Sequence, residues 1–134
     1  MKIVIIDGQG GSLGKSLTEK IKSRFDCEIY AIGTNSIATS AMIKAGADFG
    51  ATGENPVVVN CKDADIIMGP IGIIAANSLL GEITPKMAES AASSSAQKIL
   101  LPTGRCSIHI AGAEDMSLGK AVEYAVEILE KYIR

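Results

Sequence analysis

A glycine cluster that directly follows an apolar run constrains the fold of this chain more than any other feature. The run Ile3 to Ile6 ends at Asp7, and the spacing Gly8-x-Gly10-Gly11-x-x-Gly14 then leads into a helix-like pattern. This order predicts a β-strand, a tight turn and a helix N-terminus. Such a turn suits a phosphate, because the N–H groups at a helix start lack partners and glycine lets an anion approach the main chain. We therefore expect cofactor-binding residues at Gly8, Gln9, Gly10, Gly11, Ser12 and Leu13.

Strand-like and helix-like segments alternate along the rest of the chain. Expected strands lie at 3–6, 28–32, 47–51, 66–68, 98–101 and 107–111, and expected helices at 13–25, 37–45, 57–62, 84–94 and 118–133. Residues 57–59 also fit a strand, but Asn55-Pro56 resembles an N-cap followed by a first-turn proline, which favours a helix. The alternation predicts an α/β fold: a Rossmann-like, doubly wound, mostly parallel sheet of five to six strands with helices on both faces. The length of 134 residues predicts a single domain, 1–134.

A doubly wound sheet of order 3-2-1-4-5 would place its ligand at the carboxyl ends of strands 1 and 4, where the winding reverses. The turn after strand 4 contributes Gly69, Pro70, Ile71 and Gly72 to this crevice, opposite the glycine turn. Gly33, Thr34 and Asn35 follow strand 2 and are expected to flank the same site, with 102–105 on the far side. The sequence thus predicts one crevice built from three or four loops.

The spacing of the glycines limits which nucleotide motif the turn can be. A P-loop requires glycine five residues before Gly14, where the chain has Gln9, and no strand ends in an aspartate for magnesium. The acid that binds ribose hydroxyls in NAD sites is also missing after strand 2, where Thr34, Asn35 and Ser36 could instead donate to a phosphate. We expect NAD(P) or a related adenine nucleotide. The alternatives are another anionic ligand, or a turn that only packs.

Other residues offer no identified catalytic group. Asp7 is expected to cap the turn amides, with a cation or a ribose hydroxyl as alternative partners. Arg105 could hold a phosphate or simply lie exposed, and His109 is expected to be structural, on the last strand. No Tyr-x-x-x-Lys pair exists, and the cysteines at 27, 61 and 106 lack metal-ligand spacing. Catalytic residues stay unknown, no metal is expected, and whether the chain is an enzyme stays open.

Composition and the segment 73–83 bear on partners. Aromatic residues make up 4% of the chain and the net charge is -2, which argues against nucleic acid as a partner. No apolar stretch reaches the roughly 20 residues that span a bilayer, and the N-terminus lacks a signal-peptide pattern, so we expect a cytoplasmic protein without a membrane partner. Residues 73–83 have no polar face beyond Asn77, Ser78 and Glu82, so we expect a partner subunit, a ligand or the fold itself to cover them. A homo-oligomer through 73–83 is expected.

Several blocks of sequence together resemble a known family. These blocks are Ile6-Asp7-Gly8-Gln9-Gly10-Gly11, Gly33-Thr34-Asn35, Ala51-Thr52-Gly53-Glu54-Asn55, Gly69-Pro70-Ile71-Gly72-Ile73 and Gly81-Glu82-Ile83-Thr84-Pro85. They look like a small family of bacterial proteins described as a domain of unknown function, and the resemblance covers nearly the whole chain. It implies a Rossmann-like bacterial cytoplasmic protein and supplies no activity.

The leading functional hypothesis is a small protein that binds a nucleotide or dinucleotide of the NAD(P) type at the glycine turn, as a sensor or accessory subunit. It rests on the glycine turn together with the missing catalytic residues. One alternative is a small oxidoreductase or transferase whose site is completed across a homodimer. Another is a non-catalytic structural interaction module.

Overall fold

The computed structural model describes residues 1–103 and 107–133. Its elements are β1 (Ile3–Asp7), α1 (Ser12–Arg24), β2 (Ile29–Gly33), α2 (Ser36–Lys44), β3 (Phe49–Thr52), α3 (Glu54–Cys61), β4 (Ile66–Pro70), η1 (Ile71–Ile74), α4 (Pro85–Ser93), β5 (Gln97–Leu101) and α5 (Leu118–Ile133). The strands form one five-stranded sheet of order β3-β2-β1-β4-β5, with every neighbouring pair parallel. This confirms the predicted Rossmann-like α/β fold and its strand order.

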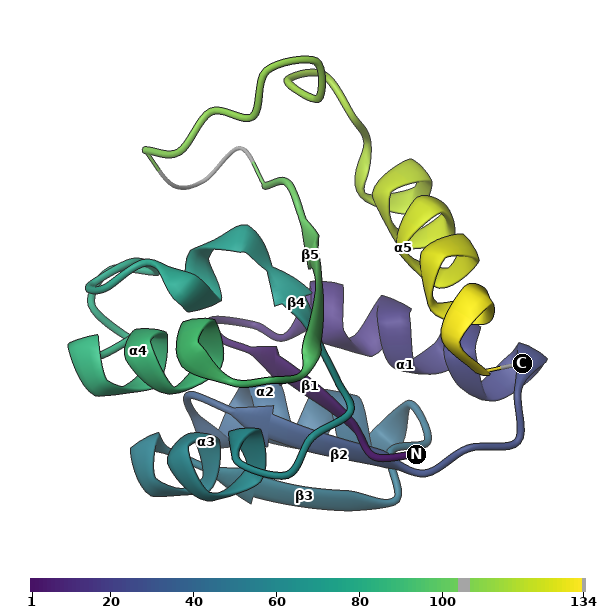
Figure 1. Cartoon of the computed structure of the whole chain (residues 1–134), viewed down its shortest axis with the longest axis horizontal. Helices are drawn as coiled ribbons and strands as arrows, with labels where there is room; N and C mark the ends of the chain where they lie inside the picture. The colour runs from purple at the N-terminus through teal and green to yellow at the C-terminus, as the bar shows by residue number, and fades with distance from the viewer. Residues whose placement is uncertain (104–106, 134) are drawn as a thin grey trace.

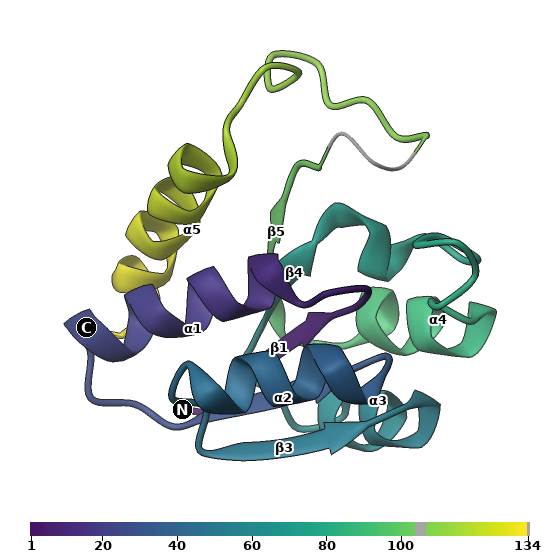
Figure 2. The ribbon, with the colours of Figure 1, turned by 180° about the vertical axis from the view of Figure 1, so that it is seen from behind.

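Helices cover both faces of the sheet (Figures 1 and 2). Ile3 and Ile5 of β1 belong to a core with α1, α2 and α5, whereas Val4 and Ile6 belong to a second core with α3 and α4. Because strand side chains alternate between faces, a run of apolar residues buried along its whole length serves both cores at once. All five residues of β1 are buried, and the four apolar ones, Ile3 to Ile6, divide between the two cores in this way.

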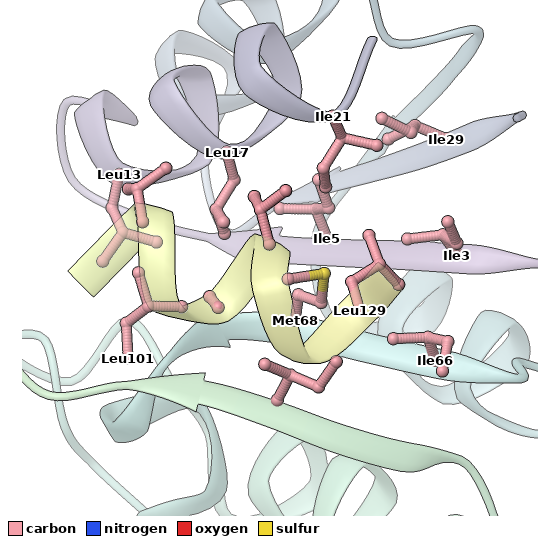
Figure 3. Close-up of a cluster of buried hydrophobic side chains, with 14 of the residues drawn as sticks. Ile3, Ile5, Leu13, Leu17, Ile21, Ile29, Ile66, Met68, Leu101 and Leu129 are labelled. Carbon is pink, nitrogen blue, oxygen red and sulfur yellow. The ribbon is translucent and has the colours of Figure 1, made fainter. Parts of the chain in front are cut away.

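The first core joins the helix after the glycine turn to the C-terminal helix (Figure 3). Leu13, Leu17 and Ile21 form the buried stripe of α1, one residue per turn. Leu129 of α5 lies in the same cluster and is fully buried. This packing fixes the start of α1, and therefore the glycine turn, at the carboxyl end of β1.

The predicted sixth strand is wrong: in the described part of the connection between β5 and α5, residues 107–117 form no strand. They arch away from the sheet and its helices (Figure 1). The alternation of Ile108, His109 and Ile110 mimics a half-buried strand, yet Ile110 is exposed and Ile108 only half-buried. A segment that buries no face does not join the sheet, even when apolar and polar residues alternate along it.

The helix favoured over a strand at 57–62 is present as α3, although its start differs from the prediction. Gly53, with a φ of 108°, is the N-cap, and the helix begins at Glu54. Asn55 and Pro56 therefore lie inside the first turn. Proline is tolerated there because N–H groups of the first turn have no acceptor within the helix, so its missing N–H costs no hydrogen bond. The neighbouring strand β4 runs two residues further than predicted, through Pro70.

The apolar segment 73–83 is covered mainly by the fold. After η1 it continues as a series of turns, and both Ile73 and Ile83 are buried in the second core. Leu80 is different, because its side chain is 96% exposed. Among the described residues, no helix is both long and apolar enough to cross a membrane.

Candidate functional site

Asp7 holds the two ends of the glycine turn together. Its Oδ1 accepts a hydrogen bond from the N–H of Gly8 at 2.8 Å, and its Oδ2 accepts one from the N–H of Gly14 at 2.7 Å. This confirms the expected capping role. Burial raises the pKa of the Asp7 carboxyl, the two backbone bonds lower it, and the charge of Glu82 raises it slightly, so that the net shift is upward.

The glycines of the turn differ in what surrounds them. A Cβ at Gly14 would lie 2.5 Å from Sδ of Met42, so glycine lets α1 pack close to α2. Gly11 is the N-cap of α1 with a φ of 77°, a left-handed conformation that favours glycine. A Cβ at Gly10 would meet nothing within 4 Å. Gly10 therefore borders open space, and packing does not explain why it is glycine.

Three N–H groups of the turn have no acceptor among the described residues. Gly11 donates to the carbonyl of Gly8, and the amides of Gly8, Gln9 and Gly14 donate to carboxylates. The N–H groups of Gly10, Ser12 and Leu13 donate to no described atom. Free N–H groups at the start of a helix carry partial positive charge and form a site for an anion.

These three residues line a cavity of about 250 Å³ at the reversal point of the sheet. Besides residues 7–13, the cavity is lined by Pro70, Leu79, Pro102, Thr103, Met116 and Leu118. The walls therefore come from the ends of β1 and β4, the turns after η1 and the connection into α5. The lining thus includes the three residues whose N–H groups are free, and most of the remaining lining residues are apolar. No lysine or arginine of the described chain lines it, so the backbone supplies the positive potential.

Glu82 closes the side of the turn that faces β2. Its Oε1 accepts hydrogen bonds from Thr34 Oγ1 at 2.5 Å, Gln9 N at 2.9 Å and Asn35 Nδ2 at 2.9 Å. The expectation that Thr34 and Asn35 are available to donate to a ligand phosphate therefore does not hold in this structure. The side-chain donors of Thr34 and Asn35 are occupied by a carboxylate of the same chain, whereas Ser36 does not bond to it.

The predicted site residues thus fall into two groups. Gly8, Gln9, Gly10, Gly11, Ser12, Leu13 and Pro70 line the cavity, whereas Gly33, Thr34, Asn35, Gly69, Ile71 and Gly72 do not. Two of the latter have packing reasons to be glycine: a Cβ would lie 2.2 Å from Thr39 Oγ1 at Gly33, and 2.3 Å from the Ile6 carbonyl oxygen at Gly69. These glycines let β2 and β4 approach their neighbours.

His109 lies on the connection into α5 and not on a strand. Its Nδ1 is 2.8 Å from Glu114 Oε1, and its side chain is 76% exposed. The expectation of a structural histidine on the last strand is therefore wrong in its placement, because an exposed loop carries the residue. Arg105 and Cys106 lie outside the described residues. Among those described, no group of histidine, cysteine and acidic side chains could hold a metal ion.

Sequence reasoning missed Glu82 and the apolar wall of the cavity. Glu82 lies 48 residues from Thr34, and an isolated glutamate among turn residues gives no local signal of its target. Leu79 belongs to the apolar segment 73–83 and Leu118 to the helical pattern 118–133, neither of which predicts a cavity wall, and no pattern singles out Met116. The signal that could have found Glu82 is its charge, which stands alone in the segment 73–83.

Comparisons with known proteins identify a family and a fold. A family model described as "Domain of unknown function (DUF3842)" matches residues 2–134. No curated protein shows significant sequence similarity to the chain. A crystal structure of a dodecameric FMN-dependent UbiX-like decarboxylase from Escherichia coli O157:H7 is similar, with a TM-score of 0.54, 15% identity, and coverage of 100% of this chain and 96% of that chain. At this identity the likeness supports the α/β fold.

Proposed function

We propose that this chain, which belongs to the DUF3842 family of unknown function, binds a mononucleotide of the FMN type, with the phosphate at the turn Gly8 to Leu13. One observation carries the proposal: Gly10, Ser12 and Leu13, whose N–H groups are free, line one cavity at the reversal point of the sheet. Ligands of doubly wound folds bind at this point, and helix-start amides hold phosphates.

The rest of the cavity supports a flavin mononucleotide over a dinucleotide. Its volume of about 250 Å³ is below the roughly 300–1,000 Å³ typical of small-molecule pockets, so it suits one nucleotide-sized part better than two. Leu79, Met116 and Leu118 offer an apolar wall for a ring system. The similar decarboxylase is FMN-dependent by its description, which makes FMN the first ligand to test. NAD(P), favoured by the sequence, becomes the second.

We assign the protein a sensor or accessory role in the cytoplasm, acting as one domain over 1–134. No nucleophile or acid–base pair lines the described part of the cavity in a way that defines a reaction. Asp7 lines it, but both of its oxygens accept bonds from the turn. Binding without a defined chemical step is the activity that these residues support.

A site completed by a second copy of the chain is the alternative, and one observation favours it. Leu80 is 96% exposed on the turns that also place Leu79 in the cavity wall. A leucine in this position loses apolar burial unless a partner covers it. The similar decarboxylase is dodecameric by its description. We therefore propose self-association through the segment 73–83.

Flavin fluorescence tests the proposed function directly. Titration of wild-type protein into FMN should quench or shift the emission with a saturable curve, and riboflavin, which lacks the phosphate, should bind at least tenfold more weakly. Ser12→Asp should weaken FMN binding at least tenfold, about 1.4 kcal/mol, because a carboxylate would occupy the free amides. An acid at this first helical position also favours the helix, so the fold is retained.

Ser12→Asn is the matched control, since it has the same size as aspartate and no charge. It should stay within about threefold of wild type, well under the 1.4 kcal/mol that a tenfold change represents. Equal affinity of wild type for FMN and riboflavin would contradict a phosphate site at the turn, as would Ser12→Asp binding FMN like wild type.

A further inference from the structure

Glu82 reaches the glycine turn from a distant part of the chain and takes three donors there. A single oxygen, Oε1, accepts from the main chain of Gln9 and from the side chains of Thr34 and Asn35. Asn35 also donates to the carbonyl oxygen of Gln9 at 3.0 Å. The carboxylate thus connects the turn after β1 to the end of β2.

Side chains pack closely against Gly8 on this side of the turn. A Cβ built at Gly8 would lie 2.6 Å from Thr34 Oγ1, 2.9 Å from Glu82 Oε1 and 3.0 Å from Leu79 Cδ1. Neither Thr34, Asn35 nor Glu82 lines the cavity, which opens toward β4 and β5 instead. The cavity therefore ends at the turn and does not continue toward β2.

This closed side is where a dinucleotide would place its second half. In doubly wound folds the pyrophosphate lies at the glycine turn, and the ribose beyond it meets the residues that follow the second strand. Here the corresponding donors, on Thr34 and Asn35, are already occupied. A ribose or a 2′-phosphate would have to displace a carboxylate and would meet its negative charge.

The turns that carry Glu82 need such an anchor. Asn77, Leu79 and Leu80 have φ values of 68°, 56° and 57°, a left-handed conformation that costs free energy for leucine. Ile83 is buried and fixes one end of the segment. The bonds of Glu82 hold the rest against the turn, so that Leu79 lies in the cavity wall.

We propose that Glu82 is a selectivity residue: it fills the β2 side of the nucleotide site and restricts the protein to mononucleotides. This inference rests on the proposed binding at the glycine turn and adds to it the excluded ligand class. Removal of the Glu82 carboxylate frees three donors and no acceptor. The opened site should therefore prefer NADP, whose 2′-phosphate accepts hydrogen bonds, over NAD.

The experiment compares wild type, Glu82→Ala, Glu82→Gln and Glu89→Gln by isothermal titration with FMN, NAD and NADP. Glu82→Ala removes the acceptor, and we expect NADP binding to improve at least tenfold over wild type and to exceed NAD binding. Glu82→Gln keeps an oxygen that can accept the same bonds without the charge, so it should gain less than threefold. Glu89 lies exposed on α4 and serves as the control for the loss of one carboxylate. Circular dichroism confirms the fold of each variant.

A second measurement covers the case in which Glu82→Ala weakens the fold. Amide hydrogen exchange should increase at 77–81 in Glu82→Ala and stay unchanged in β1 and β4, since only the anchor is lost. Exchange that rises throughout the chain would overturn the assigned anchoring role.

The outcomes separate this inference from the proposed function. Wild type that binds FMN, with Glu82→Ala that still rejects NADP, overturns the selectivity role and leaves the function intact. A gain of NADP binding in Glu82→Ala supports the selectivity role even if wild type fails to bind FMN, which would count against the proposed ligand. Two results would overturn the idea that Glu82 confers selectivity by occupying these donors. One is wild type that binds NADP as tightly as FMN, and the other is Glu82→Gln that gains as much NADP affinity as Glu82→Ala.

Discussion

Two carboxylates, Asp7 and Glu82, accept hydrogen bonds from the glycine turn, and their pKa values shift in opposite directions. Burial of Asp7 outweighs its two backbone hydrogen bonds, so its pKa is raised. Burial alone would also raise the pKa of Glu82, but the bonds from Thr34, Gln9 and Asn35 outweigh it, and the pKa is lowered. Glu82 therefore favours the folded state when ionised, whereas ionisation of Asp7 opposes folding.

The pH dependence of stability should reveal the contribution of Glu82. A carboxyl whose pKa is lower in the folded state stabilises the protein above its unfolded value, near 4.5, and this stabilisation is lost as the pH falls through the lower folded value. The free energy of unfolding, from urea titrations between pH 6 and 3, should therefore fall more steeply for wild type than for Glu82→Gln. Asp7 is present in both proteins, so only the smallest part of its pKa shift, which comes from the charge of Glu82, differs between them. Parallel curves would show that Glu82 gains nothing from its three donors.

Glycines 10 and 14 should respond in opposite ways to alanine. Gly10→Ala meets no atom within 4 Å, and its φ is not left-handed, so the free energy of unfolding should be unchanged or rise by up to about 1 kcal/mol. Gly14→Ala would bring a methyl group to 2.5 Å from Met42 Sδ and should lower the free energy of unfolding by about 1–3 kcal/mol. Urea unfolding measures both. A loss in Gly10→Ala as large as in Gly14→Ala would contradict the open space beside Gly10.

At the scale of elements, the pattern of apolar residues predicts an element correctly where that element has one buried face. The α5 residues Ala121, Val122, Ala125, Val126 and Leu129 are buried, because helical spacing brings these positions to one side. Leu118 and Tyr132 share this spacing, yet each is 42% exposed. The prediction of a strand at 107–111 is wrong because a strand also needs a neighbouring strand to pair with. Whether such a neighbour is in reach depends on distant parts of the chain, and the local pattern does not show it.

Two neighbouring residues of α5 provide a test of this packing. Leu129 is fully buried in the first core and Ile128 is 42% exposed, although both are large aliphatic residues on one helix. Leu129→Ala should lower the free energy of unfolding by about 2–5 kcal/mol. Ile128→Ala should change it by less than about 0.5 kcal/mol. Similar losses in both variants, measured by urea unfolding, would mean that α5 sits differently on the sheet.

At the scale of the whole molecule, the β/α order determined the sheet, and the sheet determined where the cavity lies. The glycine turn and the end of β4 meet as predicted, because right-handed crossovers in a parallel sheet leave a single reversal point. The closure of the β2 side was not predictable in this way. It depends on a contact between Glu82 and Thr34, which are 48 residues apart and share no pattern.

The exposed tip of the segment 73–83 leads to a prediction about assembly. Leu80 is 96% exposed and has a left-handed backbone, so the isolated chain gains nothing from a leucine there. We expect wild type to self-associate at micromolar concentration in size-exclusion chromatography with light scattering, and Leu80→Asp to shift toward the monomer because a carboxylate resists burial. The unfolding midpoint of Leu80→Asp at a concentration where both proteins are monomeric should match wild type. Ile37→Asp is the control, since Ile37 is 69% exposed on α2 and lies outside the segment 73–83. A wild type that stays monomeric across the concentration range would contradict self-association. An equal effect of Ile37→Asp would contradict the assignment of the contact to the segment 73–83.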